Sequence, residues 1–229
     1  MPEIPDTRPY LPAMGRDVLL PLYDPLTRLL GASAAHRRLL DQAGIEPGHR
    51  VLEIGCGTGN LLLAAKQRHP GAEIVGLDPD PRALQRAARK AARAGLNVQL
   101  DRGYADELPY ADASIDRVLS AFMLHHLPPP EKQAALREIR RVLAPGGSLH
   151  LLDLIAPHDH GFLSRLRRHR AGVDGHGSGH GSSSAAGRFP DVGGTGVPDL
   201  LVEAGLLGVR EVGGGRTAFG RYACYRASA

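Results

Sequence analysis

Three glycines at alternate positions, preceded by an acid, are the residues whose types and spacing most clearly indicate chemistry. The stretch Val51–Leu63 reads VLEIGCGTGNLLL, in which an apolar run enters a glycine loop and an apolar helical pattern leaves it. This predicts a strand, a tight turn and the start of a helix. Glycine lets a ligand lie across the backbone, and the N–H groups at a helix N-terminus attract hydroxyl or carboxylate oxygens. Glu53 stands where a ligand's cationic group could meet it.

A second acid follows the next apolar run. Residues 73–77 read EIVGL and lead directly to Asp78. An acid at the tip of the second strand, beside the first glycine loop, can accept hydrogen bonds from two ribose hydroxyls. The alternative is that Asp78, with Asp80, only caps the helix that begins near Pro81. The loop spacing is G-x-G-x-G, whereas a dinucleotide fingerprint has G-x-G-x-x-G.

Together these motifs resemble the class I S-adenosylmethionine-dependent methyltransferases. The likeness extends over residues 45–155, because further motifs follow in the order found in the branch that methylates small molecules, quinones and lipids. These motifs are residues 108–110 (LPY), 113–118 (ASIDRV), 124–127 (LHHL) and 143–149 (LAPGGSL). The resemblance therefore implies S-adenosylmethionine as cofactor and a small-molecule or lipid-like acceptor as substrate.

The resemblance also implies which residues hold the cofactor. The methionine end is expected at Glu53, Gly55, Cys56, Gly57, Thr58, Gly59, Asn60 and the backbone of Ala121. The ribose is expected at Asp78 and the adenine at Tyr104, Ala105 and Asp106, and Pro79 is also expected to bind the cofactor. Tyr23, on an N-terminal helix, closes on the cofactor or is a core aromatic. Family members usually carry Gly-Asp-Ala where this chain has Gly103-Tyr104-Ala105, so the adenine contact is left open between the Tyr104 ring, the Ala105 backbone and the Asp106 carboxylate.

Two adjacent histidines follow the fourth predicted strand. His125 or His126 could take a proton from a hydroxyl nucleophile, because the unperturbed pKa of histidine is near neutral. The alternative is that both pack or cap locally. The strand ends in Ser120-Ala121-Phe122-Met123 and lacks the Asn/Asp-Pro-Pro-aromatic motif with which DNA methyltransferases hold a planar amine. This argues against base methylation.

Alternating strand and helix patterns predict an α/β fold. We expect a Rossmann-like, doubly wound, mostly parallel seven-stranded sheet, with an antiparallel last strand and an N-terminal helical cap over residues 1–48, in a single domain of residues 1–229. The basic face of the helix over 81–94 is expected to be solvated. The predicted strands after the first are 73–77, 97–100, 115–120, 148–154, 208–212 and 218–226, and the predicted helices are 16–30, 33–43, 81–94, 131–143 and 197–204.

Residues 157–196 are rich in Gly, Ser and His and are expected to form a flexible insert, either a lid or a linker. Metal binding by its histidines is the weaker interpretation, since they lack regular ligand spacing, and no metal site is predicted. Within it, residues 162–168 (FLSRLRR) could form a short basic helix that touches an anionic membrane surface or substrate.

Bulk properties exclude several classes. The chain has 229 residues, 42% of them hydrophobic and none Trp, and 28 basic against 24 acidic residues give a net charge of +4. That balance argues against nucleic acid as a partner. Two cysteines make no disulfide framework, and with no signal peptide or membrane-spanning run the chain is expected to be cytoplasmic. Alternative functions are a nicotinamide-dependent oxidoreductase and a non-catalytic S-adenosylmethionine-binding regulator, and the oligomeric state is left open.

Overall fold

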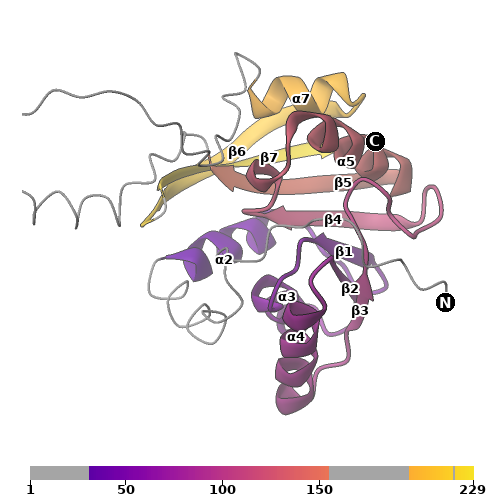
Figure 1. Ribbon diagram of the computed structural model, residues 1–229, viewed down its shortest axis with the longest axis vertical. Helices are drawn as coiled ribbons and strands as arrows, with labels where there is room; N and C mark the ends of the chain where they lie inside the picture. Colours follow the sequence, from indigo (N-terminus) through magenta and orange to yellow (C-terminus); the bar gives the residue numbers. More distant parts are fainter. Residues whose placement is uncertain (1–30, 155–195, 219) are drawn as a thin grey trace, which may run out of the picture.

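A seven-stranded sheet organises the part of the chain that the computed structural model describes, which is residues 31–154, 196–218 and 220–229 (Figure 1). Its strand order is β3-β2-β1-β4-β5-β7-β6. The strands from β3 to β5 pair in parallel, whereas β7 runs antiparallel to both of its neighbours. The strands are β1 (Arg50–Ile54), β2 (Glu73–Asp78), β3 (Gln99–Arg102), β4 (Ile115–Ala121), β5 (Leu143–Leu154), β6 (Leu207–Thr217) and β7 (Gly220–Ser228). The predicted fold class is therefore confirmed.

Helices cover both faces of this sheet. One core cluster packs α5 and α7 against residues of β1, β2, β4, β5 and β7. The other cluster packs α2 and α3 against the opposite face of the sheet. The helices are α2 (Ala32–Gln42), α3 (Asn60–Arg68), α4 (Pro81–Ala94), α5 (Pro129–Val142) and α7 (Val197–Glu203), with a single 3₁₀ turn η2 (Leu124–His126) before α5. None of the helices in the described ranges is long and apolar enough to cross a membrane, and the expected cytoplasmic location stays a prediction.

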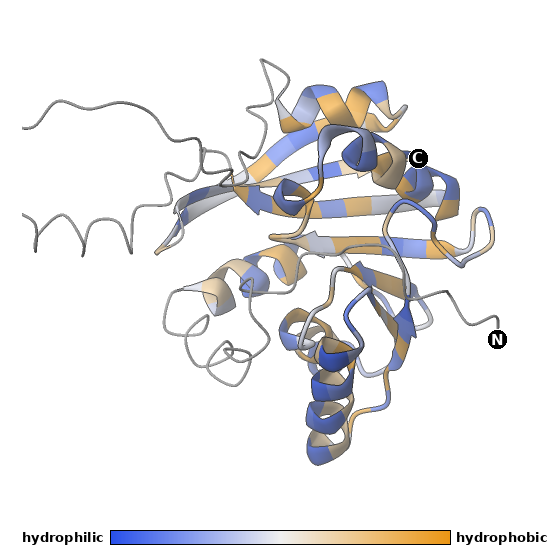
Figure 2. Cartoon of the chain, viewed as in Figure 1, coloured by the Kyte–Doolittle hydropathy of each residue, from blue (hydrophilic) through white to orange (hydrophobic). Residues whose placement is uncertain are grey.

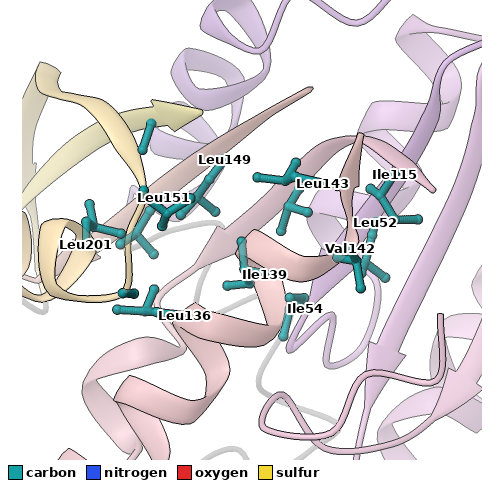
Figure 3. Packing of buried hydrophobic residues seen from close by; sticks show 14 of the residues in the cluster. Leu52, Ile54, Ile115, Leu136, Ile139, Val142, Leu143, Leu149, Leu151 and Leu201 are labelled. Carbon is teal, nitrogen blue, oxygen red and sulfur yellow. The ribbon is translucent and has the colours of Figure 1, made fainter. Parts of the chain in front are cut away.

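Leucine and isoleucine side chains lock α5 onto the sheet (Figure 3). Leu136 and Ile139 of α5 are almost fully buried in the same cluster as Leu149 and Leu151 of β5. Each such side chain contributes about 1.5–3 kcal/mol through burial. The central strands carry near-continuous apolar runs because both of their faces are covered. Glu53 is a buried acid within one of these runs, in β1, and therefore needs a separate explanation.

Local sequence signals determine where helix α4 begins and ends. Asp80 is its N-cap, with the side chain accepting a hydrogen bond from the Arg82 N–H at 2.8 Å, and Gly95 ends it in a left-handed conformation. Figure 2 shows the strongly polar outer surface of this helix. The expectation that its whole basic face is solvated is wrong for Lys90, which is partly buried and donates to the Asn60 side chain at 2.7 Å.

Several strand boundaries differ from the predicted ones. β5 begins at Leu143, because Ile115 pairs with Leu143 before an irregularity in register, whereas the strand was predicted to begin at residue 148. A Cβ on Gly147 would lie 2.8 Å from the Ala144 carbonyl oxygen, so glycine permits this close bulge. β3 starts two residues later than predicted, and β6 extends to Thr217 as the long outer strand of the closing hairpin.

Helix α2 fixes the outer strand to the rest of the molecule. The Arg38 guanidinium donates to the Gly214 carbonyl, and the Gln42 amide donates to the Val212 carbonyl at 2.9 Å. α2 is the described part of the predicted N-terminal cap; the predicted helix over 16–30, Tyr23 within it, and residues 157–195 lie outside the described residues.

Candidate active site

The carboxyl ends of β1 and β4 lie side by side where the strand order reverses. In doubly wound sheets this switch point is where ligands bind. The glycine loop (Gly55–Gly59) leaves β1 there, and the Gly55 and Cys56 N–H groups donate to the Leu77 carbonyl at 2.9 and 3.1 Å. The loop is therefore tied to the end of β2 as well as to its own strand.

The first and middle glycines of the loop have different surroundings, although both have positive φ. A Cβ on Gly55 would lie 2.4 Å from the Met123 Cγ, in the segment after β4, whereas a Cβ on Gly57 would meet no atom within 4 Å. Gly55 therefore permits a close approach between the two strand ends. Gly57 leaves open space over the loop, as a bound ligand requires.

Asp78 joins the end of β2 to this loop. Its Oδ2 accepts from the Gly57 N–H at 2.7 Å and its Oδ1 from the Asp80 N–H at 2.9 Å. Burial raises the pKa of Asp78 to about 6, against the opposing effect of these two hydrogen bonds. Capping of α4 is performed by Asp80, so the capping alternative does not account for the Asp78 side chain.

Glu53 lies within β1, 4% exposed, and its Oε2 has no hydrogen-bond partner among the described residues. Burial, followed by the negative charge of Asp78, raises its pKa well above the ordinary value, while the Leu62 N–H and the Lys90 charge oppose that rise. A buried carboxylate with an unused oxygen is costly unless a cation or donor approaches it. The residues present therefore fit a ligand that carries a positive charge.

The remaining loop residues pack closely beside these acids. Thr58 is buried, and the Asn60 amide approaches the Thr58 hydroxyl at 3.5 Å. Cys56 is buried as well, and burial followed by the charge of Glu53 raises the pKa of its thiol well above the ordinary value. A protonated, buried thiol makes Cys56 a small packing residue of the loop and not a nucleophile.

The segment expected to hold adenine lies next to Asp78. The Gly103 N–H donates to the Asp78 carbonyl at 3.3 Å, and Tyr104 forms an isolated bridge with Glu107. Tyr104, Ala105 and Asp106 are all partly buried, and Ala105 packs against the core on the α5 side. Pro79 is half-buried, and its carbonyl accepts from the Arg102 side chain at 3.3 Å.

The segment after β4 is held in an unusual conformation. Phe122 has φ 55 although it is not glycine, and its N–H donates to the Leu152 carbonyl at 2.8 Å. Its ring meets the Tyr222 ring edge-on, with centroids 6.1 Å apart. Such outliers persist where the surroundings hold them, often at functional sites. Ala121, which precedes it, is partly buried against the core on the α2 side.

His125 is held by an acid that the sequence analysis did not select. Its Nδ1 lies 2.6 Å from Oδ1 of Asp153, which is 2% exposed at the end of β5, and its backbone N–H donates to Oδ2 at 2.9 Å. The His126 ring lies against the His125 ring, with centroids 3.9 Å apart. The available signal was an acid at the end of an apolar strand, the same signal that identified Asp78.

Comparison with known proteins agrees with this geometry. A family model described as a methyltransferase domain matches residues 51–147. The chain is 42% identical over 142 residues to a demethylmenaquinone methyltransferase of Thermus thermophilus, with 61% of this chain and 64% of the relative covered. Residues 51–147 form a class I methyltransferase domain. The expected family, and with it S-adenosylmethionine as cofactor, is thereby confirmed for this domain.

Two further matches bear on the methyltransferase domain. A demethylmenaquinone methyltransferase of Deinococcus radiodurans is 38% identical over 142 residues, with 61% of this chain and 58% of the relative covered. A SAM-dependent methyltransferase from Aquifex aeolicus shares the fold, with a TM-score of 0.58, 20% identity, and 84% of this chain and 88% of that one covered. The matched stretch spans less than two thirds of either curated relative.

Proposed function

We propose that the chain transfers a methyl group from S-adenosylmethionine to a small-molecule acceptor of the quinone class. The observation that carries the cofactor half of the proposal is the buried Glu53–Asp78 pair under an open glycine loop. The acceptor half is supported by relatives whose names specify demethylmenaquinone as substrate. A nicotinamide-dependent oxidoreductase is disfavoured by the methyltransferase family match.

Each cofactor group has a complementary group in the described residues. The methionine end, with its ammonium group, would meet the unused Glu53 oxygen and the glycine loop. The ribose hydroxyls would donate to the Asp78 carboxylate, and adenine would lie against residues 104–106, with the Ala121 backbone beside the methionine end. The bound methyl donor supplies an activated methyl group, so the protein mainly has to align it with the acceptor. Effective molarities for well-oriented groups reach about 10⁵ M or more.

The N-terminal cap and the insert complete the proposal. We propose that residues 1–48 and 157–196 belong to the same domain and enclose the acceptor, the first as a helical cap and the second as an insert or lid. A peripheral membrane contact through residues 162–168 would suit a lipid-like acceptor. Only residues 31–48 and 196 of these segments lie in the described ranges.

The test is direct detection of both products. The purified chain is incubated with S-adenosylmethionine and a reduced naphthoquinone lacking the ring methyl group, and mass spectrometry follows S-adenosylhomocysteine and the methylated quinol. The Asp78→Ala variant is the matched control, because it removes the ribose acceptor at the same site. Both products are expected from the wild type and far less from the variant.

Two results would contradict the proposal. Calorimetric binding of S-adenosylmethionine without S-adenosylhomocysteine across a broad acceptor panel would favour the non-catalytic regulator. Binding of reduced nicotinamide in preference to S-adenosylmethionine would favour the oxidoreductase.

A further inference from the structure

The contact between His125 and Asp153 connects the ends of two neighbouring parallel strands. η2 follows β4, and Asp153 is the penultimate residue of β5, which pairs with β4 through Ala121 and Leu152. The His125 side chain is 23% exposed, whereas the Asp153 side chain is buried. The pair thus lies at the carboxyl edge where the methyl group and acceptor of the proposed reaction would meet.

The Asp153 carboxylate is used on both oxygens. Oδ2 accepts from the His125 N–H at 2.9 Å, and Oδ1 accepts from the Leu154 N–H at 2.8 Å and faces His125 Nδ1 at 2.6 Å. Because a carboxylate oxygen accepts, Nδ1 must carry the proton in this contact. The neutral ring then has its lone pair on Nε2, so the carboxylate fixes the tautomer as well as the ring plane.

We propose that His125 is the general base of the methyl transfer and that Asp153 is the positioning residue that holds its imidazole in the Nδ1–H tautomer. This rests on the proposed function and deepens it, because a base is useful only for an acceptor that loses a proton. Within the proposed quinone class, this selects the reduced form, a quinol, because its phenolic hydroxyl can lose a proton.

The proton and electrons balance in this step. The acceptor's proton passes to His125 Nε2, and the electron pair it leaves behind supplies the acceptor's new bond to the methyl carbon. The methyl–sulfur bond breaks with its pair remaining on sulfur, which becomes neutral. The imidazolium formed is stabilised by the Asp153 carboxylate, which keeps its charge, and it later returns the proton to water.

Other titratable groups near the pair bear on any pH dependence. The His126 ring lies against the His125 ring at an interplanar angle of 43°, and α5, the next helix along the chain, carries Glu131 and Lys132 in its first turn. On β7, burial and then the charges of Glu211 and Asp153 raise the pKa of Tyr225, so this phenol stays neutral across the working range. A pH profile is therefore assigned by variants at His125 and not by its shape alone.

The competing explanation is that Asp153 only holds η2 against β5 and does not set the tautomer of His125. A second histidine–carboxylate pair, His49 and Glu46, serves as a control that distinguishes these two explanations. His49 lies 3.7 Å from Glu46 through Nε2, while His49 Nδ1 accepts from the Glu46 N–H at 3.1 Å. His49 precedes β1, at the opposite edge of the sheet, and its contacts predict the opposite tautomer.

The first test needs neither cofactor nor acceptor. Long-range ¹H–¹⁵N NMR of the ligand-free protein should show the Nδ1–H tautomer for His125 and the Nε2–H tautomer for His49. The Asp153→Asn variant should lose the Nδ1–H signature of His125 and leave His49 unchanged. An Nε2–H tautomer for His125 in the wild type would overturn the proposal, whether or not any acceptor is known.

The second test is kinetic. General base catalysis contributes about 10²–10⁴-fold, so His125→Gln should lower kcat within that range. Asp153→Asn should lower kcat about 10-fold or more. Both variants should keep the wild-type KM for the acceptor and the wild-type calorimetric affinity for S-adenosylmethionine. The control variant His49→Gln should have wild-type kcat, KM and cofactor affinity.

Two kinetic outcomes would overturn the proposal. One is near-wild-type kcat in a folded His125→Gln variant. The other is a loss in Asp153→Asn that appears as weakened cofactor binding or lowered thermal stability with kcat unchanged, since that is the result expected of a structural tie. If the wild type methylates no acceptor, the proposed function fails, and the NMR result still decides whether Asp153 sets the tautomer.

Discussion

Asp78 and Asp153 lie at the carboxyl ends of two strands of the same sheet, β2 and β5, and both bind the backbone of a neighbouring loop. Each is buried, and each uses one carboxylate oxygen to accept a backbone N–H from a loop that follows a neighbouring strand: Gly57 after β1 for Asp78, and His125 after β4 for Asp153. They differ at the other oxygen. In Asp78 it accepts from the Asp80 N–H, whereas in Asp153 it accepts from the Leu154 N–H and also faces the imidazole nitrogen of His125.

This difference distinguishes two parts of the site. We call the surroundings of Asp78, with Glu53 and the glycine loop, the binding edge, and the surroundings of Asp153, with His125, the reaction edge. Around Asp78 lie two backbone donors, Gly57 N–H and Asp80 N–H, and two further acids, Glu53 and Asp80, so this part of the site can attract a cation and hydroxyl groups. Around Asp153 the carboxylate orients a histidine. One device, a strand-end carboxylate, thus fixes a loop for binding in one place and a titratable ring in the other.

The largest effect is expected where the two edges touch, at Gly55. In Gly55→Ala the new methyl group would overlap Met123, at 2.4 Å, in a residue with φ 71. Overpacking and left-handed strain together should lower the free energy of unfolding by about 2–4 kcal/mol, measured by urea denaturation.

Gly57→Ala is the matched control, since it has φ 52 but open space around the new Cβ. It should cost only the strain, about 1–2 kcal/mol, while S-adenosylmethionine binding measured by calorimetry is strongly weakened. Equal destabilisation by the two variants would show that the Gly55–Met123 contact does not join the edges.

The binding edge could be predicted from sequence because its signals are local. Glu53, the glycine loop and Asp78 are each recognised from a few neighbouring residues, and the parallel sheet then brings them together. The Asp153 contact depends on two elements 28 residues apart meeting in the right register, so sequence could select the histidines but not choose between them. Lys90 was assigned to the solvent because helical periodicity places it among arginines, while its long side chain reaches back to Asn60.

The next effect tests the binding edge alone. Asp78→Ala removes a charged acceptor from the ribose hydroxyls, and hydrogen bonds to a charged group are worth about 1.5–3 kcal/mol, so affinity for S-adenosylmethionine should fall at least about tenfold. Unchanged affinity in a folded variant would remove Asp78 from the ribose site.

The same carboxyl predicts opposite pH trends for stability and binding. The pKa of Asp78 rises from 3.8 to about 6 on folding, so the ligand-free fold binds its proton more tightly than the unfolded chain. Its contribution to stability is therefore present at low pH and is lost as the pH rises through about 6. Ribose binding needs the ionised form, so affinity should be about tenfold lower at about pH 5 than at about pH 8. Asp78→Asn should flatten this trend, with any remaining slope belonging to Glu53.

The smallest effect concerns Lys90, whose charge opposes the rise in the Glu53 pKa and whose amine holds Asn60 at the start of α3. In Lys90→Gln that charge is lost, so Glu53 is protonated more readily and attracts a cationic ligand less. For a partly exposed charge the effect is at most about 1 kcal/mol, or about a two- to fivefold loss of S-adenosylmethionine affinity by calorimetry. Arg89→Gln, one residue earlier and exposed, removes the same charge from the same helix and should leave affinity within error. The loss should also shrink in high salt, because charge screening weakens it. If the two variants bind alike, Lys90 belongs with the solvated basic face, as its place in the sequence first indicated, and Glu53 is tuned by burial and Asp78 alone.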